Sequence, residues 1–291
     1  FASDKVGFSA TSGPVRRWDG TSWTVMPGSP TDAVAIHGTA ADDVWTFGDK
    51  DGLRHFDGSS WTAVTKPEMA KLTAFESTSS GSFISTAILA SSPNDAWIGG
   101  VGGIAYHWDG KAWGAIQALG AGDFRTVLAV SETDVWIGAS GVGAHFDGTT
   151  WTADKSFSDI TSGVVVGPSA AYAVDLFSKL RRYDGISWSV VPGVSGNRLA
   201  ASAPDDVWLA SSGSTTASHW DGKAWSDVVL PANPDVIWAT SKTHAWMAGF
   251  SASSPKHWRW DGSSWTSMPV PTPAGNARVF GGTGPNDVFM I

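Results

Sequence analysis

Cysteine is absent from this chain of 291 residues. No disulfide framework, thiol nucleophile or thiolate metal site can therefore form, and packing alone must hold the fold together. No apolar run reaches the length of about 18 residues that a membrane-spanning helix requires, so we expect no membrane span. Charged residues make up only 16% of the chain, and the net charge is −8. Because an acidic surface repels phosphate, we expect no nucleic-acid partner.

Lysine is also sparse, whereas Ser, Thr, Gly and Trp are abundant. This composition favours an exported bacterial protein that is extracellular, periplasmic or held at the cell surface. The sequence begins at Phe1, and no basic segment followed by an apolar one comes after it. We therefore expect the chain to be a processed or trimmed product.

The abundant residues point to an all-β protein, because 18 tryptophans, 34 glycines and 15 prolines are typical of many turns and large buried rings. Sixteen of the tryptophans fall in a repeat. The motif Asp-Gly-x-x-Trp occurs seven times at intervals of 37 to 52 residues, with an aromatic residue before each Asp. The seven copies lie at residues 19–23, 57–61, 109–113, 147–151, 184–188, 221–225 and 261–265.

Each copy predicts the outer hairpin of a propeller blade. Asp-Gly between two apolar segments is typical of a tight hairpin, since Gly accepts positive φ and Asp accepts hydrogen bonds within its own turn. A block such as Asp-Val-Trp upstream predicts a second strand, and the apolar run before it predicts a first strand. We therefore predict one domain over residues 1–291, an all-β, seven-bladed β-propeller of four-stranded antiparallel blades.

The blade motif, as in Trp18, Asp19, Gly20 and Trp23, resembles the tryptophan-rich propeller repeats common in exported bacterial proteins. It is more distantly similar to the Asp-box repeats of sialidase-like propellers. The Asp-box places one residue between Asp and Gly, whereas the two are adjacent here. The resemblance therefore implies the propeller fold and does not extend to sialidase activity.

The two ends of the chain decide how the ring closes. The sequence predicts strands at Asp4–Phe8 near the start and at Ala277–Gly281 and Asp287–Ile291 near the end, and the total of 29 strands is one more than seven blades need. The simplest closure pairs Ala277–Gly281 with the N-terminal strands. In that case Asp287–Ile291 is surplus, replaces Asp4–Phe8, or belongs to an eighth blade or a longer propeller.

Two residues before each repeat Asp stands either His or Arg. The four units with His carry Asp at the start of the upstream block, whereas the three units with Arg carry Lys5, Ala170 or His244 there. This covariation predicts that imidazole and carboxylate touch and form a structural hydrogen bond between strands. The predicted structural pairs are His55 with Asp43, His107 with Asp95, His145 with Asp134 and His219 with Asp206.

No catalytic residue, metal site or cofactor site is predicted. The His-Asp pairs are multiplied by the repeat, whereas an active site is expected to break the repeat. Outside those pairs, His37, His244 and His257 show no metal-ligand spacing. The interpretation that fits these histidines is that they are ordinary strand or surface residues.

Departures from the repeat are the better candidates for ligand binding. The longest unit carries its extra length in Lys66–Ser82, which predicts a projecting loop. Trp238 and Trp258 are the only tryptophans outside repeat positions, and one third-strand position varies between units. The candidate ligand-binding residues are Trp238, Trp258, Tyr106, Arg16, Arg54 and Arg181. The alternative is that all six are ordinary strand residues.

Three functions are open at this point. The leading hypothesis is a non-enzymatic exported or cell-surface scaffold that binds a protein partner. The alternative is a carbohydrate-binding propeller with a glycan partner, since Trp and Tyr rings stack on sugar faces. A sialidase-like or lyase-like enzyme is the third, and the sequence offers no asymmetric acid–base set for it.

Overall fold

The computed structural model describes residues 14–19, 21–31, 33–48, 52–64, 88–92, 94–99, 104–117, 124, 126–251, 254–269, 280–284 and 287–290. Over these residues the protein is an all-β propeller of four-stranded antiparallel blades, as predicted for the fold class and the blade architecture. The helical element among the described residues is one short 3-10 turn, η4 (Lys155–Phe157). The predicted loop Lys66–Ser82 lies outside the described residues.

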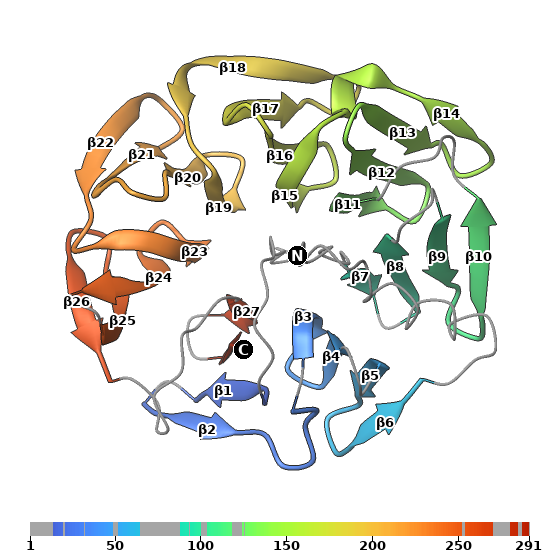
Figure 1. Ribbon diagram of the computed structural model, residues 1–291, viewed down its shortest axis with the longest axis horizontal. Coiled ribbons are helices and arrows are strands. Elements are labelled where there is room, and N and C mark those ends of the chain that lie inside the picture. Colours follow the sequence, from blue (N-terminus) through green and yellow to red (C-terminus); the bar gives the residue numbers. More distant parts are fainter. Residues whose placement is uncertain are drawn as a thin grey trace, which may run out of the picture.

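Six blades are each formed by one continuous stretch of chain and succeed one another around the ring (Figure 1). In every blade the first strand lies nearest the centre of the ring and the fourth lies at its rim. The first three blades are β3 (Ala33–Ala40), β4 (Asp43–Gly48), β5 (Gly52–Phe56) and β6 (Trp61–Ala63); β7 (Ile88–Ser92), β8 (Asp95–Gly99), β9 (Ile104–Trp108) and β10 (Trp113–Gln117); and β11 (Thr126–Ser131), β12 (Asp134–Ala139), β13 (Val142–Phe146) and β14 (Trp151–Ala153).

The other three continuous blades follow the same strand order. They are β15 (Ile160–Gly167), β16 (Ala170–Asp175), β17 (Lys179–Tyr183) and β18 (Trp188–Ser195); β19 (Arg198–Ala203), β20 (Asp206–Ala210), β21 (Thr216–Trp220) and β22 (Trp225–Val229); and β23 (Asn233–Ser241), β24 (His244–Ser251), β25 (Ser254–Trp260) and β26 (Trp265–Met268).

A further four-stranded sheet, here the composite sheet, joins the two ends of the chain. Its order is β2 (Trp23–Val25), β1 (Arg16–Trp18), β28 (Asp287–Met290) and β27 (Phe280–Gly284). β1 pairs antiparallel with β28, with Arg17 opposite Phe289. The simplest closure drawn from the sequence was therefore wrong in one strand, because it placed Asp4–Phe8 in the second position, where β28 lies. The strand order is that of the alternative in which Asp287–Ile291 takes this position. Asp4–Phe8 itself lies outside the described residues.

The repeat Asp-Gly makes the turn between third and fourth strands. In one blade the Asp147 carboxylate accepts the backbone N–H groups of Thr149 and Thr150, both at 2.8 Å. Gly148 has φ +91°, and a Cβ there would lie 2.7 Å from the side chain of Thr133 in the neighbouring turn. Glycine is therefore required twice, by backbone conformation and by lack of space.

The predicted His-Asp contacts are present in all four units. The distances from His Nε2 to Asp Oδ1 are 2.6 Å for His55 and Asp43, 2.6 Å for His107 and Asp95, 2.8 Å for His145 and Asp134, and 2.7 Å for His219 and Asp206.

A second-strand tryptophan stacks on the histidine of each of these contacts, and in three of the four its Nε1–H also donates to the aspartate. The Trp97 indole lies flat against His107, with ring centroids 4.0 Å apart, and its Nε1–H donates to Asp95 at 3.2 Å. The Asp95 carboxylate is buried, so both donors replace the water it loses on folding.

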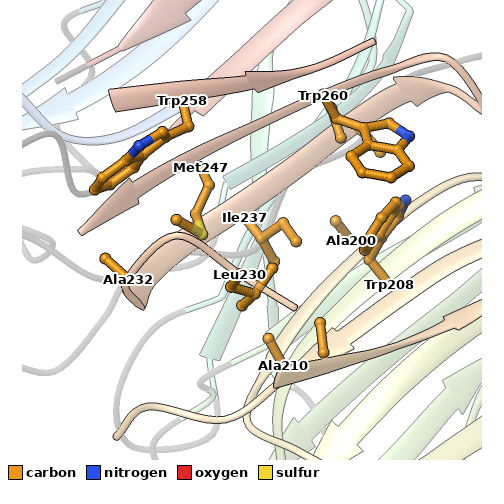
Figure 2. Packing of buried hydrophobic residues seen from close by; sticks show 12 residues of the cluster. Ala200, Trp208, Ala210, Leu230, Ala232, Ile237, Met247, Trp258 and Trp260 are labelled. Carbon is orange, nitrogen blue, oxygen red and sulfur yellow. The ribbon is translucent and has the colours of Figure 1, made fainter. Parts of the chain in front are cut away.

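The same tryptophan packs one blade against the next. Trp97 approaches Phe146 and Trp151 of the following blade at centroid distances of 5.8 and 5.9 Å. Figure 2 shows a later seam, meaning the interface between two neighbouring blades. In it Trp208 lies beside Trp260, with ring centroids 5.3 Å apart, among small and aliphatic side chains. The fully buried members of this set are Trp45, Trp97, Trp136, Trp208 and Trp246. Large rings therefore fill the gaps between diverging sheets.

Candidate functional site

The ligand-binding candidates drawn from the sequence lie mostly inside the protein. Trp238, Trp258 and Tyr106 are 4%, 7% and 1% exposed, and Arg16 is buried as well. Trp258 belongs to the seam drawn in Figure 2, near Met247. Arg54 is half-buried. The structure brings none of these five into a pocket that it describes, and a ligand-binding role for them stays a prediction.

Arg181, the sixth candidate, is tied into the fold. Its guanidinium donates to the Asp175 carboxylate at 3.1 Å and to the Ser156 carbonyl oxygen at 3.0 Å. Asp175 is buried, and Ser156 lies in η4, which connects the preceding blade to β15. Arg181 therefore fastens the η4 turn to blade β15–β18.

Blade β15–β18 breaks the repeat at three linked positions. Its second strand has Tyr172 where the other continuous blades have Trp, and Ala170 where four of them have Asp. Its third strand has Arg182 at the histidine position. The strand register places Tyr172 directly opposite Arg182, and Arg182 directly opposite Ser189 of β18. These three side chains therefore form one row on the sheet face that looks toward the next blade.

A pocket of about 500 Å³ lies along this row, between blades β15–β18 and β19–β22. A phenol ring fills less space than the indole found at this position elsewhere, and the rings of the next blade line the space that remains. Trp220 and Trp225 are part-buried and pack together with centroids 5.7 Å apart. The lining consists of Tyr172, Arg182, Ser189, Val190, Val191, Pro192, Pro204, Asp205, Trp220, Gly222 and Trp225.

An irregular fourth strand makes the outer wall. Val190 of β18 pairs with Arg181, and Ser195 pairs with Lys179, so residues 191–194 face Leu180 alone on β17. This insertion bulges, with Gly193 at φ +80°, and carries Val191 and Pro192 over the pocket. Val190 is 49% exposed at its edge. The wall is therefore apolar and open to solvent.

The charged side chains around the pocket differ in whether they have a bonding partner. Asp205 accepts a hydrogen bond from the Lys242 ammonium at 2.5 Å, and this contact lowers the pKa of the Asp205 carboxyl. Arg182 is exposed, and its guanidinium has no hydrogen bond or ion pair with any residue that the structure describes. The pocket therefore presents one unmatched positive charge.

The floor of the pocket is held in place by Tyr172. Its hydroxyl donates to the carbonyl oxygen of Pro204 in the next blade at 2.9 Å. Burial raises the pKa of the Tyr172 phenol above its ordinary value, so the group stays a neutral donor. Tyr172 thus bridges the two blades by a hydrogen bond where the repeat uses ring packing.

This pocket was not predicted from the sequence, although the sequence contains residues that indicate it. Ala170 and Arg182 were recognised as departures from the His-Asp pattern, and the unit lacks the Asp-Val-Trp block. Tyr172 stands where other blades have the larger Trp, and this difference in ring size predicts an unfilled space between the blades. The β18 bulge has no comparable signature, because it depends on strand pairing.

The described residues contain neither a metal-binding cluster nor a membrane-spanning helix. Within them, no three His, Asp or Glu side chains come together in a way that could hold a metal ion. No helix there has the length and apolar character needed to cross a membrane.

Solved structures with the same overall fold are propellers of different functions. A structure titled "YCF48 bound to D1 peptide" has a TM-score of 0.55 and 18% identity, covering 71% of this chain and 76% of its own. YCF48 from Cyanidioschyzon merolae has a TM-score of 0.62 and 14% identity, covering 89% and 95%. A streptogramin B lyase has a TM-score of 0.63 and 11% identity, covering 95% and 96%.

No protein-family profile matches the sequence, and no curated protein matches it. At identities of 18% and below, the structural likeness establishes the propeller fold alone. Function must therefore be argued from the pocket.

Proposed function

We propose that this chain is a non-enzymatic interaction module that binds a segment of a partner protein in the pocket between blades β15–β18 and β19–β22. One observation carries the proposal. Where the repeat has a tryptophan between the blades, Tyr172 stands beside a pocket that is lined by Trp220, Trp225 and Arg182, and Arg182 has no hydrogen-bond partner among the described residues. Tryptophan, tyrosine and arginine are enriched among the residues that dominate binding energy in protein interfaces.

The pocket chemistry favours binding over catalysis. Its one carboxylate, Asp205, is engaged by Lys242, and its phenol donates to a backbone carbonyl. General acid–base catalysis needs a pair of groups with opposed roles near one reacting atom. The described lining offers no such pair, so the lyase-like function is not the one we propose.

The structural neighbours support a peptide ligand as one use of such a propeller. One neighbour is YCF48 bound to a D1 peptide, and another is a streptogramin B lyase. The first shows that a propeller of this general shape holds a peptide. The pocket residues of the present chain supply the argument for this protein.

A second part of the proposal concerns how the propeller ring closes. We propose that the composite sheet acts as the seventh blade and closes the ring, since β1 and β28 pair over three residues on either side of the seam. Closure removes two open sheet edges that would invite aggregation. An extracytoplasmic location, expected from the composition, completes the proposal.

A matched pair of tryptophan variants tests the function. Wild-type protein is used to select binders from a pool of random heptapeptides, and the selected peptides are titrated onto Trp225→Ala and Trp151→Ala. Both residues start a fourth strand, but Trp151 packs against Trp97 whereas Trp225 lines the pocket. We expect Trp225→Ala to lose binding by about 10-fold or more and Trp151→Ala to keep it. Equal loss in both, or no selected peptide at all, would overturn the proposal.

Glycan binding is the second candidate, because two neighbouring indoles form a platform for a sugar ring. A glycan array probed with the same proteins separates the two. Binding of a glycan that Trp225→Ala abolishes, with no peptide selected, would replace the peptide by a sugar.

A further inference from the structure

We infer that the pocket recognises an acidic peptide, whose carboxylate pairs with Arg182 while a neighbouring apolar side chain lies against Trp225 and Val190. This inference rests on the proposed function and adds the chemistry of the partner to it. It follows from how Arg182 differs from the residues at the same position of other blades, from the charges around it, and from the wall beside it.

In other blades, the residue equivalent to Arg182 has a structural role. His55, His107, His145 and His219 use this position to bind an aspartate of their own blade, which is buried in three of the four. Arg259 occupies it over the Trp246 ring at 5.8 Å, a cation–π contact. Arg182 has neither partner, because Ala170 replaces the aspartate and Tyr172 replaces the indole. Its guanidinium is thus left for a group from outside.

The nearby acids make no hydrogen bond with Arg182, although the charge of Asp184 attracts it. Asp205 is paired with Lys242. Asp184, two residues away, directs its carboxylate at the backbone N–H groups of Ile186 and Ser187 at 3.0 and 2.9 Å. Both carboxylates are therefore occupied. A ligand carboxylate at Arg182 gains a charge-assisted hydrogen bond, in bidentate geometry where the planes align.

The wall beside Arg182 favours a peptide over a small carboxylate. Val190, Pro192 and Trp225 line an apolar slot of the pocket, whose volume of about 500 Å³ exceeds that of a single side chain. β18 is the outermost strand of its blade, so its outer edge carries backbone groups that no other described strand pairs with. An extended peptide can hydrogen-bond to that edge while its side chains enter the slot.

The test uses two synthetic pools of random heptapeptides, one with amidated and one with free C-termini. Each pool is passed over immobilised protein, and the bound peptides are sequenced by mass spectrometry. The proteins are wild type, Arg182→Gln, Val190→Glu and the matched control Lys155→Gln, which removes one exposed positive charge in η4 on another part of the surface. Thermal melting verifies that each variant is folded.

We expect Asp or Glu next to an apolar residue to be enriched on wild type and on Lys155→Gln. The selected peptides should bind about 10-fold more weakly to Arg182→Gln and to Val190→Glu, and should weaken further with added salt. Acid enrichment in the amidated pool identifies a side-chain carboxylate. Enrichment confined to the free-acid pool identifies a C-terminal carboxylate as the group bound.

The failures of the two proposals are distinguishable. Selected peptides without acidic residues that bind Arg182→Gln normally but lose affinity for Trp225→Ala would overturn acidic recognition and leave the pocket as the binding site. Peptides that bind Arg182→Gln and Trp225→Ala as well as wild type would overturn both.

Discussion

At the scale of single residues, the polar groups between the strands act together rather than alone. Asp95 is buried and accepts from both His107 and Trp97, while the two donor rings stack on each other. In one blade a third donor joins, because the Tyr183 hydroxyl reaches Asp134 from the next blade at 3.0 Å. Histidines that look like catalytic candidates in the sequence are therefore braces within blades.

His107→Ala is expected to lower the free energy of unfolding by about 2 kcal/mol, because it leaves the buried Asp95 with one donor fewer. Thermal or urea unfolding measures the loss. Lys111→Ala, on the exposed turn of the same blade, is the control and should change little. An unchanged melting temperature for His107→Ala would count against the structural role.

His257 makes stability depend on pH at the seam beside the composite sheet. Burial, and then the nearby Arg16, lowers the pKa of His257 from 6.5 to about 4. The unfolded chain therefore takes up a proton at higher pH than the folded chain does. The contribution to stability is complete above pH 6.5 and is lost as the pH falls toward 4.

His257→Gln should therefore show a smaller drop in melting temperature between pH 7.5 and pH 5 than wild type does. The turn carboxylates do not confuse the comparison, because the pKa values of Asp57 and Asp261 fall from 3.8 to about 2 and their contribution is lost only in stronger acid. Parallel pH profiles for the two proteins would contradict the assignment.

At the scale of elements, the Asp-Gly turn is fixed by two separate constraints. Gly148 has φ +91° and no room for a Cβ, whereas Gly28 has φ +70° with nothing within 4 Å. Alanine at Gly28 therefore introduces backbone strain alone, of about 1 kcal/mol. Alanine at Gly148 adds a clash and should destabilise by clearly more, as measured by urea unfolding. Equal effects at the two sites would show that crowding plays no part.

The sequence could predict the hairpins, the strand order within a blade and the His-Asp contacts, because each depends on local turn chemistry or on covariation between copies. It left open whether β28 would take the place of Asp4–Phe8, since both segments suit a second strand. The pocket was not predicted from the sequence either. The missing volume at Tyr172 becomes visible only when the neighbouring Trp220 and Trp225 are set against it.

At the scale of the whole molecule, the two ends of the chain meet in one sheet. Arg17 lies directly opposite Phe289 across the β1–β28 pair. Cα atoms of opposed antiparallel residues are close enough for a disulfide. The absence of natural cysteine gives a clean background.

Arg17→Cys combined with Phe289→Cys should form a disulfide on oxidation, because the pairing holds the two positions together. The cross-link encloses nearly the whole chain and should raise the free energy of unfolding by about 4 kcal/mol. Gel mobility without reductant and thermal unfolding measure the two effects. Each single variant serves as a control, and two persistent free thiols in the double variant would contradict this closure.

The central claim is that a break in the repeat creates the binding pocket, and repairing the break tests it most directly. The variant Ala170→Asp, Tyr172→Trp, Arg182→His restores the aspartate, indole and imidazole of the other blades. Isothermal titration with a peptide selected on wild type measures the affinity, and thermal unfolding verifies the fold. We predict an equal or higher melting temperature and a loss of affinity of about 10-fold or more, which is about 1.4 kcal/mol. An unchanged affinity in a variant that melts at the same or a higher temperature would contradict the account.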